Sequence, residues 1–320
     1  MLVRPEIAAL RQDDTPQREA QAALTEAFAT WADRVQSRAV FADMALYAGG
    51  AALDDCPALA AIFAGDGAAA LWVGEWAKVM LRGLCGHPLG HVPLRHGTNG
   101  LVSTLLLGRS GDAMLALVAV DGAALARQPA SSGVSFAPID SHEYVLAGSA
   151  RGQIITCAGP GEMQTTLTSR DIDLRPGMAI TLDGAREALR LSAAEGVLVS
   201  LRLQRRQPRG HVTQEYELST GQLRHRAAAA MRESRHALMV NLLGRMGRRD
   251  ALPMLTEIAR EEASDDLRWQ ALRETLGLDT AQGFRLLSEI AGREGDPLAP
   301  PARRLQAQLL AQYPMLAEIA

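Results

Sequence analysis

Four histidines and a glutamate are the residues of this sequence whose types suit metal chemistry. They are His87, His91, His96, His142 and Glu143. Imidazole nitrogens and carboxylate oxygens bind divalent ions such as iron and zinc, and three of these histidines lie within ten residues. The spacing disfavours a shared ion, because Pro88 and Gly90 interrupt the helix that would align the first two imidazoles. We therefore expect no metal and no other cofactor, and keep an iron or zinc site as the alternative.

Other catalytic motifs are missing from the sequence. No Gly-x-Ser-x-Gly nucleophile motif occurs, and Ser131-Ser132-Gly133 lies in a run flanked by prolines that is typical of a linker. The glycine-rich run 158–161 contains a proline and lacks the lysine of a phosphate-binding loop. Carboxylate pairs such as Asp54-Asp55 stand at predicted helix ends, where they act as caps. We assign no catalytic or cofactor-binding residue and favour a binding protein over an enzyme.

Arginines are concentrated between residues 202 and 250. This segment holds eleven arginines against four acidic residues, an excess of seven positive charges. Such a surface can meet phosphates or an acidic protein. It contains a single aromatic residue, Tyr216, so stacking against nucleic-acid bases is not expected. The candidate partner-binding residues are Arg205, Arg206, Arg209, Arg245, Arg248 and Arg249. The alternative is that these arginines pair with the acidic helices predicted for the C-terminal region.

The composition is that of a folded protein with an aliphatic core. The chain has 320 residues, 48% hydrophobic and 4% aromatic, and a formal net charge of -3. This length favours two folding units over one, and the net charge excludes a uniformly basic nucleic-acid-binding protein. The N-terminus lacks the pattern of a secretory signal, no apolar run reaches the length of a membrane span, and the three cysteines form no Cys-x-x-Cys pair. We expect a cytoplasmic protein that does not contact membranes.

The hydrophobic periodicity divides the chain into three regions. Residues 6 to about 80 show helical spacing, with Pro16 at a predicted helix start and an apolar stripe from Ala20 to Val35. From about His87 the apolar runs become short and are separated by turns rich in glycine and proline, which is typical of antiparallel strands. The predicted strands are residues 92–94, 101–107, 113–120, 144–146, 153–157, 163–167, 178–182, 188–191 and 197–203. After about Gln207 the pattern is helical again.

Two short motifs stand out among the predicted strands. They are Glu143-Tyr-Val-Leu-Ala-Gly148 and Ile172-Asp-Leu-Arg-Pro-Gly-Met-Ala-Ile180. Through these motifs, residues 139–205 resemble a cupin-type small β-barrel. We expect Gly148 and Gly177 at tight corners between antiparallel strands, with at least one of them at positive φ.

The resemblance also implies where a metal would bind. Here only His142-Glu143 matches the first element of the family's metal motif, and Arg186 follows the later strand in place of a histidine. Along residues 178–182, alternation puts Met178, Ile180 and Leu182 on one face, which we expect to point into the barrel. An apolar lining cannot hold a bare divalent ion. We therefore predict a barrel without metal, either packed or with a pocket for a small apolar ligand.

A pair of similar segments marks the C-terminal region. Residues 255–259 read Leu-Thr-Glu-Ile-Ala and residues 287–291 read Leu-Ser-Glu-Ile-Ala, an offset of 32. The order of a helix, a turn with glycine, Asp-Ala, a second helix and Asp-x-Arg resembles a HEAT repeat, in which each unit buries its apolar face on the next. The resemblance implies that Arg268 ties adjacent units together. It also implies burial of Leu255, Ile258, Leu287 and Ile290.

These patterns together predict an α+β protein of three domains. They are an N-terminal helical region at residues 1–85, a cupin-like antiparallel β-barrel at 86–207 and a HEAT-like α-solenoid at 208–320. We expect a regulatory or ligand-sensing protein whose main partner is another protein, because solenoids present extended faces and barrels that lack their metal persist as sensors. A divergent metal-dependent cupin oxygenase or isomerase is the first alternative. Nucleic-acid binding through residues 202–249 is the second.

Overall fold

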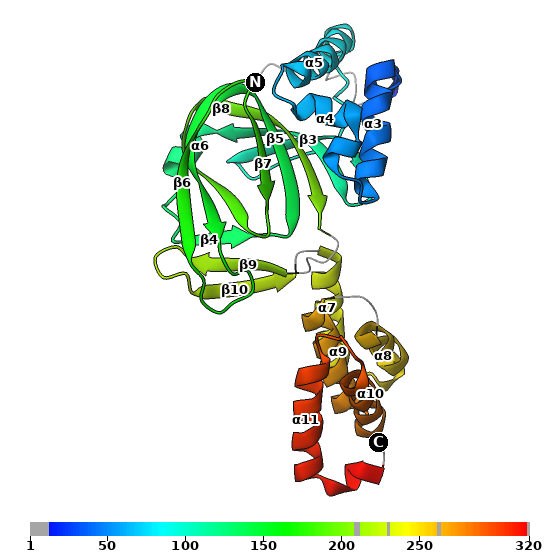
Figure 1. Cartoon of the computed structure of the whole chain (residues 1–320). Helices are drawn as coiled ribbons and strands as arrows, with labels where there is room; N and C mark the ends of the chain where they lie inside the picture. Colours follow the sequence, from blue (N-terminus) through cyan, green and yellow to red (C-terminus); the bar gives the residue numbers. More distant parts are fainter. Residues whose placement is uncertain (1–12, 208–211, 229–230, 261–263, 319–320) are drawn as a thin grey trace. The chain divides into compact units, whose positions relative to one another are not determined.

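The computed structural model describes residues 13–207, 212–228, 231–260 and 264–318. The chain forms two compact units, of which the first comprises Met1–Pro208 and Tyr216–Leu223 and the second comprises Arg209–Glu215 and Arg224–Ala320. Figure 1 shows the elements of both units coloured along the sequence. The predicted boundary between a helical domain at 1–85 and a β domain is absent from this division, because the N-terminal helices share a core with the sheet.

The first unit begins with helices that the sequence predicts. They are α2 (Thr15–Ala32), α3 (Val35–Ala48), α4 (Pro57–Phe63) and α5 (Ala68–Gly86). Proline stands in the first turn of α2 and of α4, where its missing N–H costs no hydrogen bond. Asp43 of α3 accepts hydrogen bonds from the backbone N–H groups of Ala58 and Leu59 at 2.7 and 3.1 Å, so it caps α4.

Within the described residues, no single helix is both long and apolar enough to cross a bilayer. The pair Pro57–Phe63 and Ala68–Gly86 reaches that length and composition only when the two are taken together, and it is bent by 97°.

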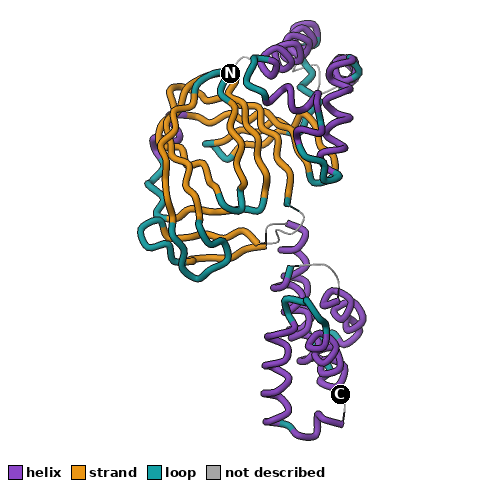
Figure 2. Tube along the Cα trace, in the orientation of Figure 1, coloured by secondary structure: helices purple, strands orange, loops and turns teal. Residues whose placement is uncertain are grey.

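The strands form a large sheet and a small one (Figure 2). They are β1 (His96–Thr98), β2 (Val102–Ser110), β3 (Ala113–Asp121), β4 (Gly133–Phe136), β5 (Ile139–Cys157), β6 (Leu167–Leu174), β7 (Ala179–Asp183), β8 (Glu187–Arg206), β9 (Val212–Glu217) and β10 (Leu223–Ala228), with the short helix α6 (Gly122–Arg127) after β3. The large sheet has seven strands in the order β1-β2-β3-β8-β5-β6, with β7 paired to β5, and the small sheet has the order β10-β9-β4. Within the described residues this order is an open path, in place of the closed barrel that the sequence suggested.

Two long strands, β5 and β8, pair along most of their length. Each joins two segments that the sequence analysis predicted as separate strands, and shifts in register near residues 145–152 let the pair bend. Gly148 lies at this bend with φ +78°, and a Cβ there would collide with the backbone carbonyl of Val197. The predicted positive φ is therefore confirmed, but Gly148 bends one strand and makes no corner between two. Gly177, at φ +92°, lies in the turn between β6 and β7, as predicted.

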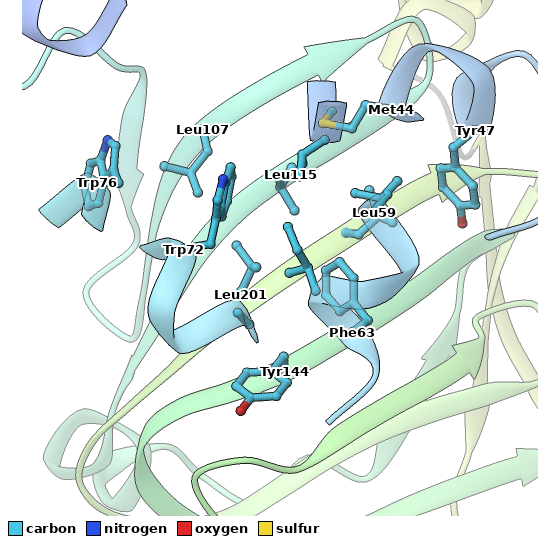
Figure 3. Packing of buried hydrophobic residues seen from close by; sticks show 14 of the residues in the cluster. Met44, Tyr47, Leu59, Phe63, Trp72, Trp76, Leu107, Leu115, Tyr144 and Leu201 are labelled. Atoms are coloured by element: carbon cyan, nitrogen blue, oxygen red, sulfur yellow. The ribbon is translucent and has the colours of Figure 1, made fainter. Parts of the chain in front are cut away.

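The main core of the first unit lies between the helices and the outer face of the large sheet. Figure 3 shows Trp72 and Phe63 from the helices close to Leu115, Tyr144 and Leu201 from the strands. All five are at most 8% exposed. Aliphatic and aromatic burial of this kind stabilises the fold by removing apolar surface from water. The sequence placed these residues in separate domains, whereas the structure packs them into one cluster.

The remaining differences from the predicted elements are local. Residues 92–94 form no strand, β6 starts only at Leu167, and β4 occupies a run that was interpreted as a linker. The strands β9 and β10 occupy residues 212–228, which were expected to be helical. Tyr216 in β9 is fully buried, with its ring 6.1 Å from that of Phe136 in β4. This packing against a distant segment overrides the weak local preference for helix.

The second unit contains helices joined by short turns. They are α7 (Met231–Arg245), α8 (Leu252–Arg260), α9 (Asp265–Leu278), α10 (Thr280–Gly292) and α11 (Ala299–Gln312). Leu255, Leu287 and Ile290 are fully buried in one cluster, and Ile258 is half-buried against it. Leu255 and Leu287, which are 32 residues apart in the two similar segments, are therefore both buried, as predicted. The stacking of successive units in a HEAT-like solenoid stays a prediction.

Arg268 is a buried structural residue of the second unit. It is 7% exposed, its Nη1 and Nη2 donate to the two carboxylate oxygens of Asp296 at 3.1 and 2.5 Å, and its Nε donates to the carbonyl of Ala259 at 3.2 Å. These hydrogen bonds hold the pKa of Asp296 below its ordinary value. The guanidinium thereby links α8, α9 and the turn before α11, and the assignment of these helices to adjacent repeat units stays a prediction.

Candidate ligand-binding site

The candidate site lies on the inner face of the large sheet, where β5 and β8 pair. The register sets Ser141 opposite Gln204 and Glu143 opposite Arg202. Because side chains alternate along a strand, these four polar residues share one face of the sheet. The intervening residues of both strands point to the opposite face, where the N-terminal helices pack.

Glu143 and Arg202 form a hydrogen-bonded ion pair on this face. The Glu143 Oε2 atom accepts a hydrogen bond from Arg202 Nε at 3.0 Å and lies 2.9 Å from Arg202 Nη2. Its Oε1 atom accepts a hydrogen bond from the hydroxyl of Ser200. The side chain of Glu143 is 6% exposed and that of Arg202 is 28% exposed. A buried carboxylate is tolerated only when such donors compensate its lost hydration, so this charge is balanced within the protein.

A cavity of about 480 Å³ borders the ion pair. Its polar lining includes Ser141, Glu143, Glu187, Arg190, Arg202 and Gln204. Its apolar lining includes Leu101, Val120, Leu125, Leu182, Leu189 and Leu191. An apolar wall with a few well-placed polar groups is the usual construction of a small-molecule site.

The apolar wall agrees with the sequence analysis and the polar wall does not. Ile180 and Leu182 of β7 are buried in the inner cluster with Met178 packed against it, while Ala179 and Thr181 are exposed, as alternation predicted. Glu143 is paired directly with Ile180 across β5 and β7 and brings its ion pair with Arg202 into the same cavity lining, so the expectation of a purely apolar interior is wrong. The missed signal was the polar series at residues 200, 202 and 204, which alternates with leucines in a predicted strand.

His142 lies on the other face of β5, away from the cavity. Its ring is 6.0 Å from that of Tyr47 in α3 and 6.2 Å from that of Phe63 in α4, and Nδ1 is 3.0 Å from the hydroxyl oxygen of Thr181. Burial lowers the pKa of His142 below its ordinary value. Consecutive strand residues point to opposite faces, so His142 and Glu143 cannot both reach one ion. This geometry separates the pair that the sequence analysis treated as candidate ligands.

The other candidate metal ligands are also dispersed. His87 and His91 are exposed residues that follow α5, and His96 is an exposed residue of β1. Within the parts of the chain that the structure describes, no group of three or more His, Cys, Asp or Glu side chains is arranged to hold a metal ion. The residues proposed from the sequence are therefore not brought together.

Arg205 is occupied by contacts within the first unit. Its Nη1 donates to the carbonyls of Tyr47 and Ala51 at 2.8 and 2.7 Å, and its Nη2 lies 3.2 Å from Asp140 Oδ2. The guanidinium carbon is 4.0 Å from the centre of the Tyr47 ring. Burial raises the pKa of Tyr47 to about 12, although the nearby Arg205 charge opposes the shift. Arg205 thus joins α3 to the sheet, and its partners lie in the first unit and not in the acidic C-terminal helices that the alternative named.

The other partner-binding candidates belong to different units. Arg206 is half-buried at the end of β8 in the first unit, and Arg209 lies outside the described residues. Arg245, Arg248 and Arg249 are exposed and belong to the second unit. Arg248 is paired with Asp250 at 2.6 Å. The basic segment of the sequence is therefore divided between two units.

The comparisons with known proteins give no family assignment. No protein-family model matches the sequence, and no curated protein matches it. Among solved structures, ectoine synthase from P. lautus is 14% identical with a TM-score of 0.23, over 34% of this chain and 67% of that one. HutD from Pseudomonas fluorescens SBW25 is 20% identical with a TM-score of 0.25, over 37% of this chain and 58% of that one. A cupin superfamily protein from Desulfitobacterium hafniense DCB-2 is 15% identical with a TM-score of 0.22, over 35% of this chain and 83% of that one.

The third of these neighbours is described as a cupin superfamily protein. The match to HutD spans less than two thirds of that chain. TM-scores this low neither place the chain in the superfamily nor assign it an activity.

Proposed function

We propose that this protein is a ligand-sensing interaction protein. Its first unit binds a small molecule in the cavity beside Glu143 and Arg202, and its second unit contacts another protein. The observation that carries the proposal is the cavity of about 480 Å³, which combines an apolar wall with a buried ion pair. The resemblance of the β region to cupins agrees with this role. Glu143, which matches part of that family's metal-binding motif, here accepts hydrogen bonds from Ser200 and Arg202.

Binding is favoured over a chemical step by the state of Glu143. Its two oxygens already accept hydrogen bonds from Ser200 and Arg202. A general base or metal ligand needs a carboxylate whose lone pairs are directed at the substrate or ion. In this site the carboxylate instead fixes Arg202, whose side chain is the more exposed member of the pair.

The second unit supports the interaction role by its surface. Four large apolar side chains on and just after α7 are between 49% and 72% exposed. They are Leu238, Met239, Leu242 and Met246. The exposed residues Arg245, Arg248 and Arg249 follow in the same segment. An apolar stripe beside basic side chains complements a partner segment that carries both apolar and acidic residues.

A thermal-shift screen tests ligand binding. The full chain is heated with a diverse set of small metabolites, and compounds that raise Tm are carried forward, since a ligand stabilises the folded state by mass action. Ser141→Phe places a ring in the cavity wall, and Ser169→Phe, on an exposed position of β6, is the matched control. We expect the stabilisation in the parent chain and in Ser169→Phe, and its loss in Ser141→Phe. Equal stabilisation of both variants would place the ligand elsewhere and refute the proposal.

Photo-crosslinking tests the protein contact. A photoreactive residue at position 242 of the full chain is expected to capture a partner whose crosslinked peptide is rich in acidic and apolar residues. The same residue at the exposed position Arg304 serves as the control. Changing Arg248 and Arg249 to Glu should abolish capture at position 242. Capture that survives this charge reversal would exclude an acidic partner.

A further inference from the structure

We propose that the ligand of this cavity is a zwitterion with an apolar body, of the α-amino-acid class. The inference rests on the proposed function and specifies its substrate class. It follows from the arrangement of charge in the cavity wall.

The wall presents two opposite charges side by side. Glu143 Oε2 and Arg202 Nη2 are 2.9 Å apart, on directly paired positions of β5 and β8. The two remaining charged lining residues are Glu187 and Arg190, so the lining holds two carboxylates and two guanidinium groups. Glu187 accepts a hydrogen bond from the backbone N–H of Asp183, and Arg190 donates one to the carbonyl of Ser131. The cavity as a whole therefore carries no net charge, which matches a ligand of no net charge.

A ligand with a single charge would disturb this balance. An anion that drew Arg202 away would leave the buried Glu143 carboxylate without its counter-charge, and a cation bound to Glu143 would compete with the guanidinium. A zwitterion with its ammonium and carboxylate on neighbouring atoms can extend the pair into a four-charge array. Each protein charge then gains an opposite charge and loses none.

The pair has hydrogen-bonding capacity left for such a ligand. Among the described residues, Arg202 contacts Glu143 through a hydrogen bond from Nε and an ion pair at Nη2, and Nη1 is left to bind a carboxylate. Ser141 and Gln204 line the cavity next to the pair, and neither side chain has a hydrogen-bond partner within the described part of the chain. Their hydroxyl and amide groups can each accept a hydrogen bond from an ammonium.

The apolar part of the cavity lining accounts for the apolar body of the ligand. Val120 and Leu182 are 7% and 9% exposed, and Leu189 and Leu191 lie beside them in the inner cluster. A volume of about 480 Å³ accommodates an amino acid with a large apolar side chain. The polar head group would thus contact Glu143 and Arg202 while the side chain contacts these apolar residues.

Calorimetry with three probes of one shape tests the charge requirement. The probes are L-phenylalanine, which is a zwitterion, 3-phenylpropanoate, which is an anion, and 2-phenylethylamine, which is a cation. We expect L-phenylalanine to bind the full chain at least about tenfold more tightly than either of the others, since each of them leaves one charge of the wall unmatched. In the double variant Glu143→Leu/Arg202→Met this preference should disappear. Arg170→Met, on an exposed position of β6, should keep it.

Each other result overturns the inference in a distinguishable way. Equal affinities for the three probes would remove the zwitterion requirement and leave ligand binding intact. Tighter binding of the anion or the cation would assign a different ligand class. No binding of L-phenylalanine refutes the amino-acid class, while the proposed function is judged separately by the metabolite screen with Ser141→Phe. Circular dichroism of the double variant confirms that a lost preference is not a lost fold.

Discussion

We expect removal of one member of the Glu143–Arg202 ion pair to destabilise the protein more than removal of both. In Arg202→Met, the carboxylate of Glu143 keeps its burial, with 6% of the side chain exposed, and loses its counter-charge. Breaking a buried pair in this way costs about 3–5 kcal/mol. Because 28% of the Arg202 side chain is exposed, water partly replaces the lost partner, and we expect about 2–4 kcal/mol.

The double variant Glu143→Leu/Arg202→Met should be much closer to the parent chain. Both charges are gone, so no group is left buried without a partner, and apolar side chains fill the same space. Such replacements cost little or even stabilise. We expect a loss below about 1 kcal/mol, to which the unpaired hydroxyl of Ser200 contributes. The double variant should thus be more stable than the single one.

Urea denaturation followed by circular dichroism measures these free energies. Parent, Arg202→Met, Glu143→Leu and the double variant form a double-mutant cycle, from which the coupling of the pair follows. The slope of the transition must stay constant across the four proteins for the comparison to hold. A double variant that is as unstable as the sum of its single variants would show that the two side chains do not interact. That result would refute the assignment of a compensated charge in the cavity wall.

Four further predictions concern other parts of the chain. Leu287→Ala should cost about 2–5 kcal/mol in denaturation, because the side chain is fully buried. Gly177→Val should lower Tm through backbone strain, since φ is +92° and, among the described residues, only the Tyr144 hydroxyl lies within 4 Å of an added Cβ. Stability should fall as the pH drops below 6.5, the ordinary pKa of histidine, because His142 is held neutral by burial and must gain a proton on unfolding. Elemental analysis of the purified protein should show no stoichiometric iron or zinc, including in His142→Ala.

Controls make each of these results decisive. The exposed leucine variant Leu238→Ala should leave stability nearly unchanged, and a similar cost at both leucines would contradict the core assignment. Gly196→Val tests strain at another positive φ, whereas Gly97→Val, at an ordinary φ, should be tolerated. In His142→Gln the dependence on pH between 7.5 and 5.5 should weaken, and an unchanged slope would point to other groups. A stoichiometric metal that is lost in His142→Ala would restore the oxygenase alternative.

The local pattern of the sequence determined many elements of this fold. Pro16 and Pro57 mark the starts of α2 and α4, and the alternation in residues 178–182 gave the inner face of β7. Gly177 was placed in its turn because few other residues adopt positive φ. These features depend on a few neighbouring residues, which is why sequence reasoning finds them.

Features that depend on contacts between distant segments could not be predicted from the sequence. The strands β9 and β10 were taken for helix, because their pairing and the burial of Tyr216 against Phe136 involve residues far apart in the chain. The bend at Gly148 made one strand look like two, since a register shift leaves no local hydrophobic signature.

The candidate site likewise combines features that the sequence predicts with features that only the tertiary structure shows. From the sequence, His142 and Glu143 form one candidate pair, and Arg202 belongs to a basic cluster. Only the tertiary structure puts His142 against the helices and Glu143 in the cavity, because consecutive strand residues face opposite ways once one face is covered. Glu143 and Arg202 are separated by 59 residues, and the register between β5 and β8 makes them neighbours. The sequence determined which residues could carry charge, and the antiparallel register decided which charges meet, because a shift of one residue would move every side chain to the other face.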